Sequence, residues 1–166
     1  MSKKTALLII TAALFAIAMI LMQNGSRATV QAEKALNSLL SCTLEDVEKL
    51  DAALTPQLPS SEPGISSQGA ELSAYLAEHF GESMTDNCIE KLAANRTFYR
   101  SAKLAKANNC DILMSELKLS ARGGSEDTLS FSAVLTANGS TVERISGSVR
   151  MVNEATEWKA DLITID

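Results

Sequence analysis

Residues 127–165 read DTLSFSAVLTANGSTVERISGSVRMVNEATEWKADLITI, and this stretch decides the fold. Apolar and polar side chains alternate along three segments of it, which is the pattern of β-strands with one buried face. The connections NGS and NEATE are short and rich in turn-forming residues, so consecutive strands should pair antiparallel. The inward-facing residues are predicted to be Leu129, Phe131, Ala133, Leu135 and Ala137, then Ile145, Gly147, Val149 and Met151, then Trp158, Ala160 and Leu162.

A further strand is predicted just before this stretch, in the segment CDILMSELKLSAR at residues 110–122. Its apolar residues change face near Ser115 and Glu116, which indicates a β-bulge. The connection GGSED that follows is again short. Residues 110–166 therefore predict a curved, four-stranded antiparallel meander.

Helical spacing precedes the strands. Thr43 offers an N-cap between two apolar stripes, so residues 29–54 predict a pair of helices. Residues 55–69 hold all three prolines among serines and glycines and predict an exposed loop. More helices are expected over residues 70–109, with Gly81 ending one, Thr85 capping the next, and the segment after Thr97 continuing or restarting it. Helices followed by a meander indicate an α+β fold, with the helices packed on one face of the sheet.

The amino terminus contains 18 uncharged residues, 5–22, which as a helix would span roughly 27 Å, close to a hydrocarbon core. Lys3 and Lys4 precede this run, so we expect the amino terminus to stay inside a bacterial cell membrane and residues 29–166 to lie outside it. Residues 1–28 are thus a signal anchor. The alternative is a signal peptide, with secretion after cleavage near Ala28, because Ser26 and Ala28 fit a signal peptidase site.

Composition limits the function of residues 29–166, which are expected to form a single extracytoplasmic domain. They hold 12 basic and 20 acidic residues, a net charge of 12 − 20 = −8, and this charge repels nucleic acid. The three cysteines are an odd number, and whether Cys88 and Cys110 pair is left open. With one histidine in the chain, no metal site and no cofactor are predicted.

The opening segment AEKALNSLLSCTLEDVEKLDAALTP and the final segment SGSVRMVNEATEWKADLITI carry a family resemblance. With the helices and meander between them, they resemble the nuclear transport factor two-like superfamily, whose cone-shaped, cystatin-like α+β fold encloses a pocket between sheet and helices. The resemblance covers about residues 29–166. It implies either a binding or assembly role or an enzyme site in that pocket. The steroid-isomerase pattern is not matched, because Tyr75 and Tyr99 fall in predicted helices.

Two groups of residues are candidates for a binding site. An apolar ligand in the pocket would be lined by Leu129, Phe131, Leu135 and Trp158. Arg96, Arg100 and Lys103, with Lys91 and Lys106 near them, form a basic stripe that suits lipid headgroups, an anionic wall polymer or an acidic protein partner, unless it is simply a solvated helix face. His79 at a helix end is a weak candidate for a general base.

These features predict a non-catalytic binding or assembly domain that is held at the membrane by residues 5–22 and serves a protein partner or a small apolar ligand. Two alternatives stay open. One is a pilin-like structural subunit, although residues 5–22 lack the acidic residue typical of pilins. The other is an enzyme of the nuclear transport factor two-like fold that uses the same pocket.

Overall fold

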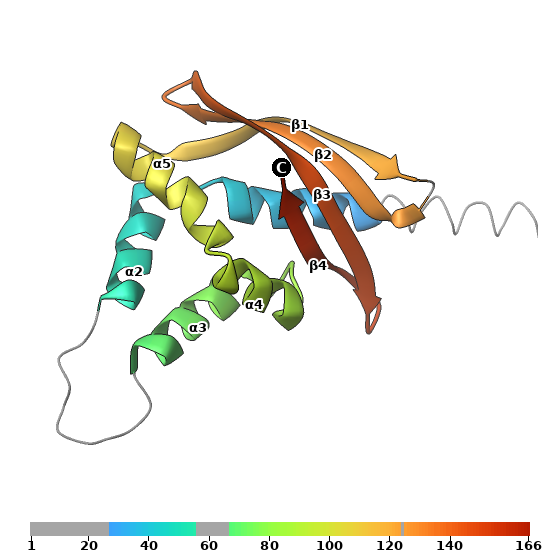
Figure 1. Ribbon diagram of the computed structural model, residues 1–166, viewed down its shortest axis with the longest axis horizontal. Coiled ribbons are helices and arrows are strands. Elements are labelled where there is room, and N and C mark those ends of the chain that lie inside the picture. The colour runs from blue at the N-terminus through green and yellow to red at the C-terminus, as the bar shows by residue number, and fades with distance from the viewer. Residues whose placement is uncertain (1–26, 56–66, 124) are drawn as a thin grey trace, which may run out of the picture.

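A computed structural model of the chain describes residues 27–55, 67–123 and 125–166 (Figure 1). Helices come first and strands follow, which confirms the α+β prediction. The elements are a helix at residues 27–40, α2 (Leu44–Leu54), α3 (Ser67–Phe80), α4 (Asp86–Ala94), the 3-10 helix η1 (Thr97–Tyr99), α5 (Arg100–Asn108), β1 (Ile112–Arg122), β2 (Ser125–Ala137), β3 (Ser140–Glu154) and β4 (Glu157–Ile165).

The four strands form one sheet in the order β1-β2-β3-β4, and every neighbouring pair is antiparallel. The predicted meander is therefore confirmed, and Figure 1 shows that the sheet is curved. Alternation along β2 places one set of side chains against the helices. Leu129, Phe131, Ala133, Leu135 and Ala137 are all buried, as are Ile145, Val149 and Met151 on β3.

Two of the sheet's register shifts, one in β1 and one in β4, bear on which predicted side chains face the core. In β1 the register shifts between Ser115 and Lys118, and Glu116 has a φ of 50°, so the predicted bulge is confirmed. A second register shift on β4 follows Ala160, which pairs with Met151, whereas Leu162 pairs with Arg150. The prediction that Leu162 faces inward is wrong, because the extra residue reverses the alternation. Ile163 is buried instead, with 7% of its surface exposed.

The helix at residues 27–40 supplies much of the core that covers the sheet (Figure 1). Its buried side chains recur at helical spacing and are Ala28, Ala32, Ala35, Leu36, Leu39 and Leu40. The small alanines let the helix approach the sheet closely, and the leucines fill the space between them. Ser101 on α5 donates a hydrogen bond from Oγ to the Leu39 carbonyl oxygen at 2.9 Å, which fixes α5 against this helix.

Capping residues start the next helices where the sequence predicts them. Thr43 Oγ1 accepts from the Asp46 backbone N–H at 3.1 Å, and the Asp46 carboxylate accepts from the Thr43 N–H at 2.9 Å, a reciprocal capping box. Thr85 caps α4 by accepting from the Cys88 N–H. The helix α3 ends at Phe80, just before Gly81, as predicted, but it begins at Ser67 and so includes the last residues of the expected loop.

The rest of the expected loop, residues 56–66, lies outside the described residues, and so does the expected anchor at residues 5–22. Across residues 27–55, 67–123 and 125–166, none of the helices has both the length and the apolar character needed to cross a membrane.

Candidate functional site

The candidate site is a hollow of about 650 Å³ between the α4–α5 segment and the carboxyl-terminal half of β4. Hereafter this hollow is the basic groove. Its polar rim comes from Lys91, Asn95, Arg96, Thr97, Arg100, Lys103, Glu143 and Thr164, and its apolar lining from Leu92, Tyr99, Leu104, Leu162, Ile163 and Ile165. The groove thus joins helices and a strand that lie about 60 residues apart in the sequence, and Figure 1 shows α4 and α5 on this side of the sheet.

Three cations of the groove are exposed: Lys91, Arg96 and Lys103. None of them forms an ion pair with a residue that the structure describes. Lys103 Nζ lies 5.6 Å from the centre of the Tyr99 ring, a cation–π contact that leaves its charge uncompensated. In a domain of net charge −8, this cluster produces a local positive potential.

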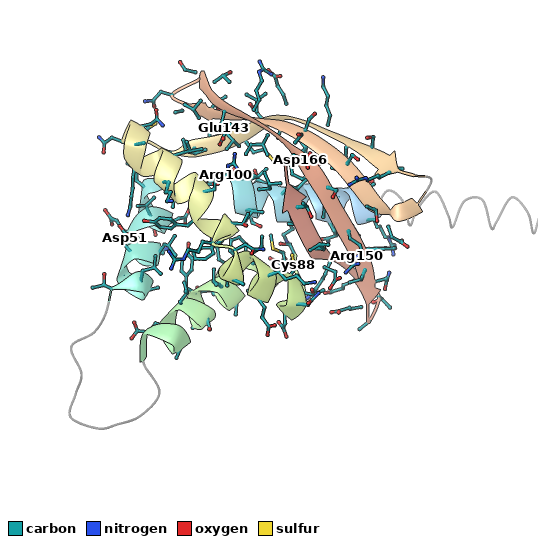
Figure 2. The ribbon with its side chains drawn as sticks, viewed as in Figure 1. Asp51, Cys88, Arg100, Glu143, Arg150 and Asp166 are labelled. Carbon is teal, nitrogen blue, oxygen red and sulfur yellow. The ribbon has the colours of Figure 1, made fainter. Side chains whose placement is uncertain are left out.

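The fourth cation, Arg100, is neutralised within the groove. Its Nη2 lies 2.6 Å from Glu143 Oε1 and its Nε lies 3.2 Å from Oε2, so the pair is bidentate and joins α5 to β3 (Figure 2). Hydrogen bonding to Glu143 raises the pKa of Arg100 above its usual value. Glu143 and Arg100 together therefore add no net charge to the groove.

The chain bends sharply at Arg96, and this bend shapes the groove. The helix α4 ends at Ala94 with Asn95 as its C-cap, Arg96 takes a left-handed conformation with a φ of 53°, and η1 follows. The segment after Thr97 thus restarts a helix rather than continuing the first. A non-glycine residue in this conformation carries a conformational cost, which asparagine bears more easily than arginine.

The predicted basic stripe is divided by this geometry. Arg96, Arg100 and Lys103 all line the groove, together with Lys91. Lys106 points elsewhere, because its Nζ donates to Asp51 Oδ1 on α2 at 2.6 Å and to the Tyr99 hydroxyl at 3.1 Å. Lys106 therefore ties α5 to α2, and the hydrogen bond to Asp51 raises its pKa.

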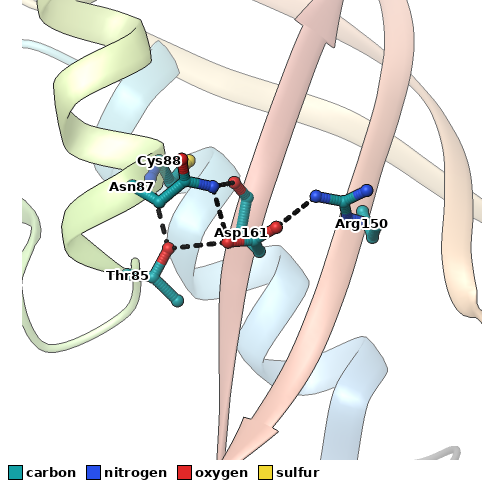
Figure 3. Close-up of polar contacts among 5 residues, drawn as sticks. All are labelled: Thr85, Asn87, Cys88, Arg150 and Asp161. Atoms are coloured by element: carbon teal, nitrogen blue, oxygen red, sulfur yellow. Dashed lines mark hydrogen bonds and ion pairs between the residues drawn. The ribbon is translucent and has the colours of Figure 1, made fainter.

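Asp161, the extra residue of the β4 bulge, ties the strand to α4 beside the groove (Figure 3). Asp161 Oδ1 accepts from Asn87 Nδ2 at 2.9 Å and from Thr85 Oγ1 at 3.1 Å, and its Oδ2 accepts from Arg150 Nη2. These donors, Asn87 first and then Arg150, hold the pKa of Asp161 below its ordinary value. Cys88 lies behind them, and burial raises the pKa of its thiol to about 11.

The four residues predicted to line an apolar ligand pocket do not lie in the basic groove. Leu129, Phe131 and Leu135 are packed in the core and are at most 6% exposed. Trp158 is half-buried beside a separate hollow that is lined by Arg27, Val30, Gln31, Thr156 and Glu157. The structure therefore does not bring the four residues together around one of its described hollows.

The remaining candidates also lie away from the groove. His79 stacks on Tyr75 with ring centroids 5.5 Å apart, and burial raises the pKa of Tyr75 to about 12. Cys42, Cys88 and Cys110 are all free, so Cys88 and Cys110 do not pair. Within the described residues, no three His, Cys, Asp or Glu side chains gather closely enough to hold a metal ion.

Sequence reasoning missed the β-strand side of the groove. Glu143, Leu162, Thr164 and Ile165 all contribute to it, and none was a candidate. The adjacent apolar residues Leu162 and Ile163 were the one available signal, because such a pair breaks strict alternation and is typical of a bulge. No helical or strand pattern reveals which helix lies beside which strand.

The likeness to the nuclear transport factor two-like superfamily rests on the order of elements and on the segments quoted above, and it stays a prediction. No protein-family model, no curated protein and no solved structure matches this chain.

Proposed function

We propose that this protein is a binding domain that recognises an acidic protein partner in the basic groove. One observation carries the proposal: Lys91, Arg96 and Lys103 converge on one hollow in a domain of net charge −8, and no described acidic residue pairs with them. Holding three like charges close together costs electrostatic free energy. An anionic partner would remove this cost when it binds.

The apolar lining favours a protein partner over a simple anion. Leu104, Leu162 and Ile165 are partly exposed and line the same groove as the cations. A partner that covers them would gain about 25 cal/mol for each Å² of apolar surface removed from water. A phosphate group alone would leave this surface wet. Carboxylate side chains on an apolar segment match both parts of the groove.

The groove's titratable groups favour binding over catalysis. Its carboxylate, Glu143, is held by two hydrogen bonds from Arg100. His79 lies on α3 between Tyr75 and Phe80 and does not line the groove. A general base needs a free basic group within reach of the bound substrate. The groove instead presents lysine and arginine, which suit recognition of negative charge.

We propose further that residues 5–22 anchor the domain outside the cell membrane. Support comes from Ala28, which belongs to the helix at residues 27–40 and is only 1% exposed. Cleavage near Ala28 would remove a core side chain, so retention of the amino terminus is favoured over secretion. Mass spectrometry of the membrane fraction should find the intact chain, and a chain beginning at Thr29 would contradict the anchor.

The groove can be tested with the labelled heptapeptide EVEVEVE and the full chain in a non-ionic detergent. Fluorescence anisotropy would compare wild type with a groove variant that carries Lys91→Gln, Arg96→Asn and Lys103→Gln. Asparagine is chosen at Arg96 because it tolerates the left-handed backbone there. We expect the groove variant to bind the peptide about tenfold more weakly at low salt, where charge attraction is strongest.

A second variant controls for net charge. Lys118→Gln, Arg122→Gln and Arg144→Gln remove the same charge from exposed positions that do not line the groove. We expect this control to bind within about twofold of wild type, because screening weakens distant charges. Equal losses in both variants, or no binding by wild type, would refute the proposal. Tighter binding of glycerol 1-phosphate than of the peptide would point to a lipid or wall polymer instead.

A further inference from the structure

The outer edge of β4, the side away from β3, is paired with the segment before α4 at Ala160 and Asp161. Ala160 exchanges two backbone hydrogen bonds with the segment before α4: its N–H donates to the Ser83 carbonyl at 2.9 Å, and its carbonyl accepts from the Thr85 N–H at 2.9 Å. Asn87 Nδ2 then lies 3.4 Å from the Asp161 carbonyl oxygen. At Ala160 and Asp161, the edge is therefore closed by residues 83–87.

Beyond the bulge, the ladder shows which backbone groups face outward. The Asp166 N–H donates to the Ser146 carbonyl at 3.0 Å, so these opposite residues form a hydrogen-bonded pair. In an antiparallel ladder such pairs alternate with non-bonded pairs, and the register places Ile165 opposite Gly147 and Ile163 opposite Val149. The N–H and C=O groups of Ile163 and Ile165 therefore point away from β3.

Part of this outward edge has no partner among the described residues. The backbone N–H of Ile163 faces the Cys88 thiol, where it opposes the rise in the pKa of Cys88 that burial causes. No hydrogen bond occupies the Ile163 carbonyl, the Ile165 N–H or the Ile165 carbonyl in the ranges that the structure covers. Both residues line the basic groove. The groove thus combines an open strand edge with three cations.

We propose that the acidic partner binds as an extended peptide, which adds to the open edge at Ile163–Ile165 as a fifth strand of the sheet. This inference rests on the proposed function. Main-chain hydrogen bonds to an exposed edge give affinity in this mode, and alternate side chains give specificity. Carboxylates of the added strand would reach Lys91, Arg96 and Lys103, while its apolar side chains would cover Leu104 and Leu162.

The charge of the groove disfavours the other common occupant of an open edge, a second copy of this chain. Pairing two β4 edges would bring two sets of Lys91, Arg96 and Lys103 together. Like charges in such proximity destabilise an interface. Cationic side chains near an edge are also a known protection against self-pairing. The same cations would attract an acidic strand.

A single substitution separates strand addition from charge attraction. Ile165→Pro removes the outward N–H and leaves the inward ladder and all charges intact, since proline is tolerated on an edge strand where its missing N–H faces outward. Ile165→Val, which keeps the N–H, is the matched control. We expect Ile165→Pro to bind EVEVEVE about tenfold more weakly than Ile165→Val, with the same dependence on salt.

The outcomes distinguish the two proposals. Equal binding by Ile165→Pro and Ile165→Val, with a loss in the groove variant, would overturn strand addition and leave the acidic-partner groove standing. If Ile165→Pro unfolds, as judged by circular dichroism, a fully N-methylated EVEVEVE peptide replaces it, and binding equal to that of the unmodified peptide would overturn strand addition. Dimers in sedimentation that are lost in Ile165→Pro would show a second copy at the edge and also overturn it.

Discussion

Arg100 on α5 and Glu143 on β3 are joined at two points, with Nη2 2.6 Å from Oε1 and Nε 3.2 Å from Oε2. Their side chains keep 39% and 28% of their surface exposed, so solvent screens the attraction between them. The pair is therefore worth at most about 1 kcal/mol of stability. Its larger effect is on the groove, where Glu143 cancels the charge of Arg100.

Two neutral substitutions, one on each side of this pair, should change peptide binding in opposite directions. Glu143→Gln should strengthen binding of EVEVEVE several-fold because Arg100 then joins the uncompensated cations. Arg100→Gln should weaken binding because Glu143 then opposes the peptide. Both should lower the free energy of unfolding by about 0.5–1 kcal/mol, since both break one partly exposed pair. Anisotropy and urea denaturation measure the two effects, and binding changes of the same sign would contradict this account.

The lowered pKa of Asp161 predicts that the free energy of unfolding depends on pH. Hydrogen bonds from Asn87, Arg150 and Thr85 lower its pKa from an ordinary value of 3.8. A group with a lowered pKa in the folded state contributes stability above its unfolded pKa, and the contribution is lost as the pH falls through the folded pKa. Asp161→Asn should therefore cost about 1–2 kcal/mol at pH 7, and the difference from wild type should shrink below about pH 3.8.

Urea denaturation at pH 7 and about pH 3 measures this change. Glu154→Gln, an exposed position on β3, serves as the control and should show little difference from wild type at either pH. A gap between Asp161→Asn and wild type that stays constant between the two pH values would show that the carboxylate charge is not what stabilises the contact of β4 with α4.

The two bulges show what the sequence predicts and what it does not. In β1 the apolar residues on either side of Ser115 and Glu116 change face, so the bulge is visible in the local pattern. In β4 the pattern allows Leu162 or Ile163 to face the core. The structure favours Ile163 by hydrogen bonds that hold Asp161, and their donors are Thr85 and Asn87 at the start of α4 and Arg150 on β3. Local periodicity contains no information on such distant partners.

The basic groove could likewise be predicted from the sequence only in part. The spacing of Arg96, Arg100 and Lys103 predicts a basic stripe, and the structure places all three around one hollow. The neutralisation of Arg100 depends on Glu143, which lies 43 residues further along the chain. The open edge of β4 depends on how far the segment before α4 extends along that strand. Both are consequences of tertiary packing, which a single sequence does not display.

Position 147 on β3 should require glycine. It lies opposite Phe131, and a Cβ added to it would lie 2.9 Å from Phe131 Cε1 and would overlap the Thr164 carbonyl oxygen. Gly147→Ala should therefore destabilise the protein by about 1–3 kcal/mol, or more if the backbone of β4 must move. Ser148→Ala at the next position is the control, and thermal denaturation measures both.

A double variant tests whether the Phe131 ring or the Thr164 carbonyl oxygen causes this loss of stability. Phe131→Leu in the Gly147→Ala background should recover only part of the loss, because it relieves the contact with the ring and not the overlap with the Thr164 carbonyl. Full recovery would show that the ring alone requires glycine at this position.

The two threonine caps should differ in cost. Thr43 is exposed and makes the capping box with Asp46, so Thr43→Ala should cost about 1 kcal/mol. Thr85 is 6% exposed, and its hydroxyl both caps α4 and donates to Asp161 Oδ1. Thr85→Ala should cost about 2–3 kcal/mol, because it also leaves the half-buried carboxylate of Asp161 with one donor fewer.

Serine at the same positions distinguishes the hydroxyl from the methyl group. Thr85→Ser keeps both hydrogen bonds and should recover most of the loss seen in Thr85→Ala, whereas Thr43→Ser should match wild type within about 0.5 kcal/mol. Urea denaturation of the four variants gives the comparison. Equal costs for Thr43→Ala and Thr85→Ala would mean that the bond from Thr85 to Asp161 adds nothing, and the bulge would then be held by Asn87 and Arg150 alone among the side chains described.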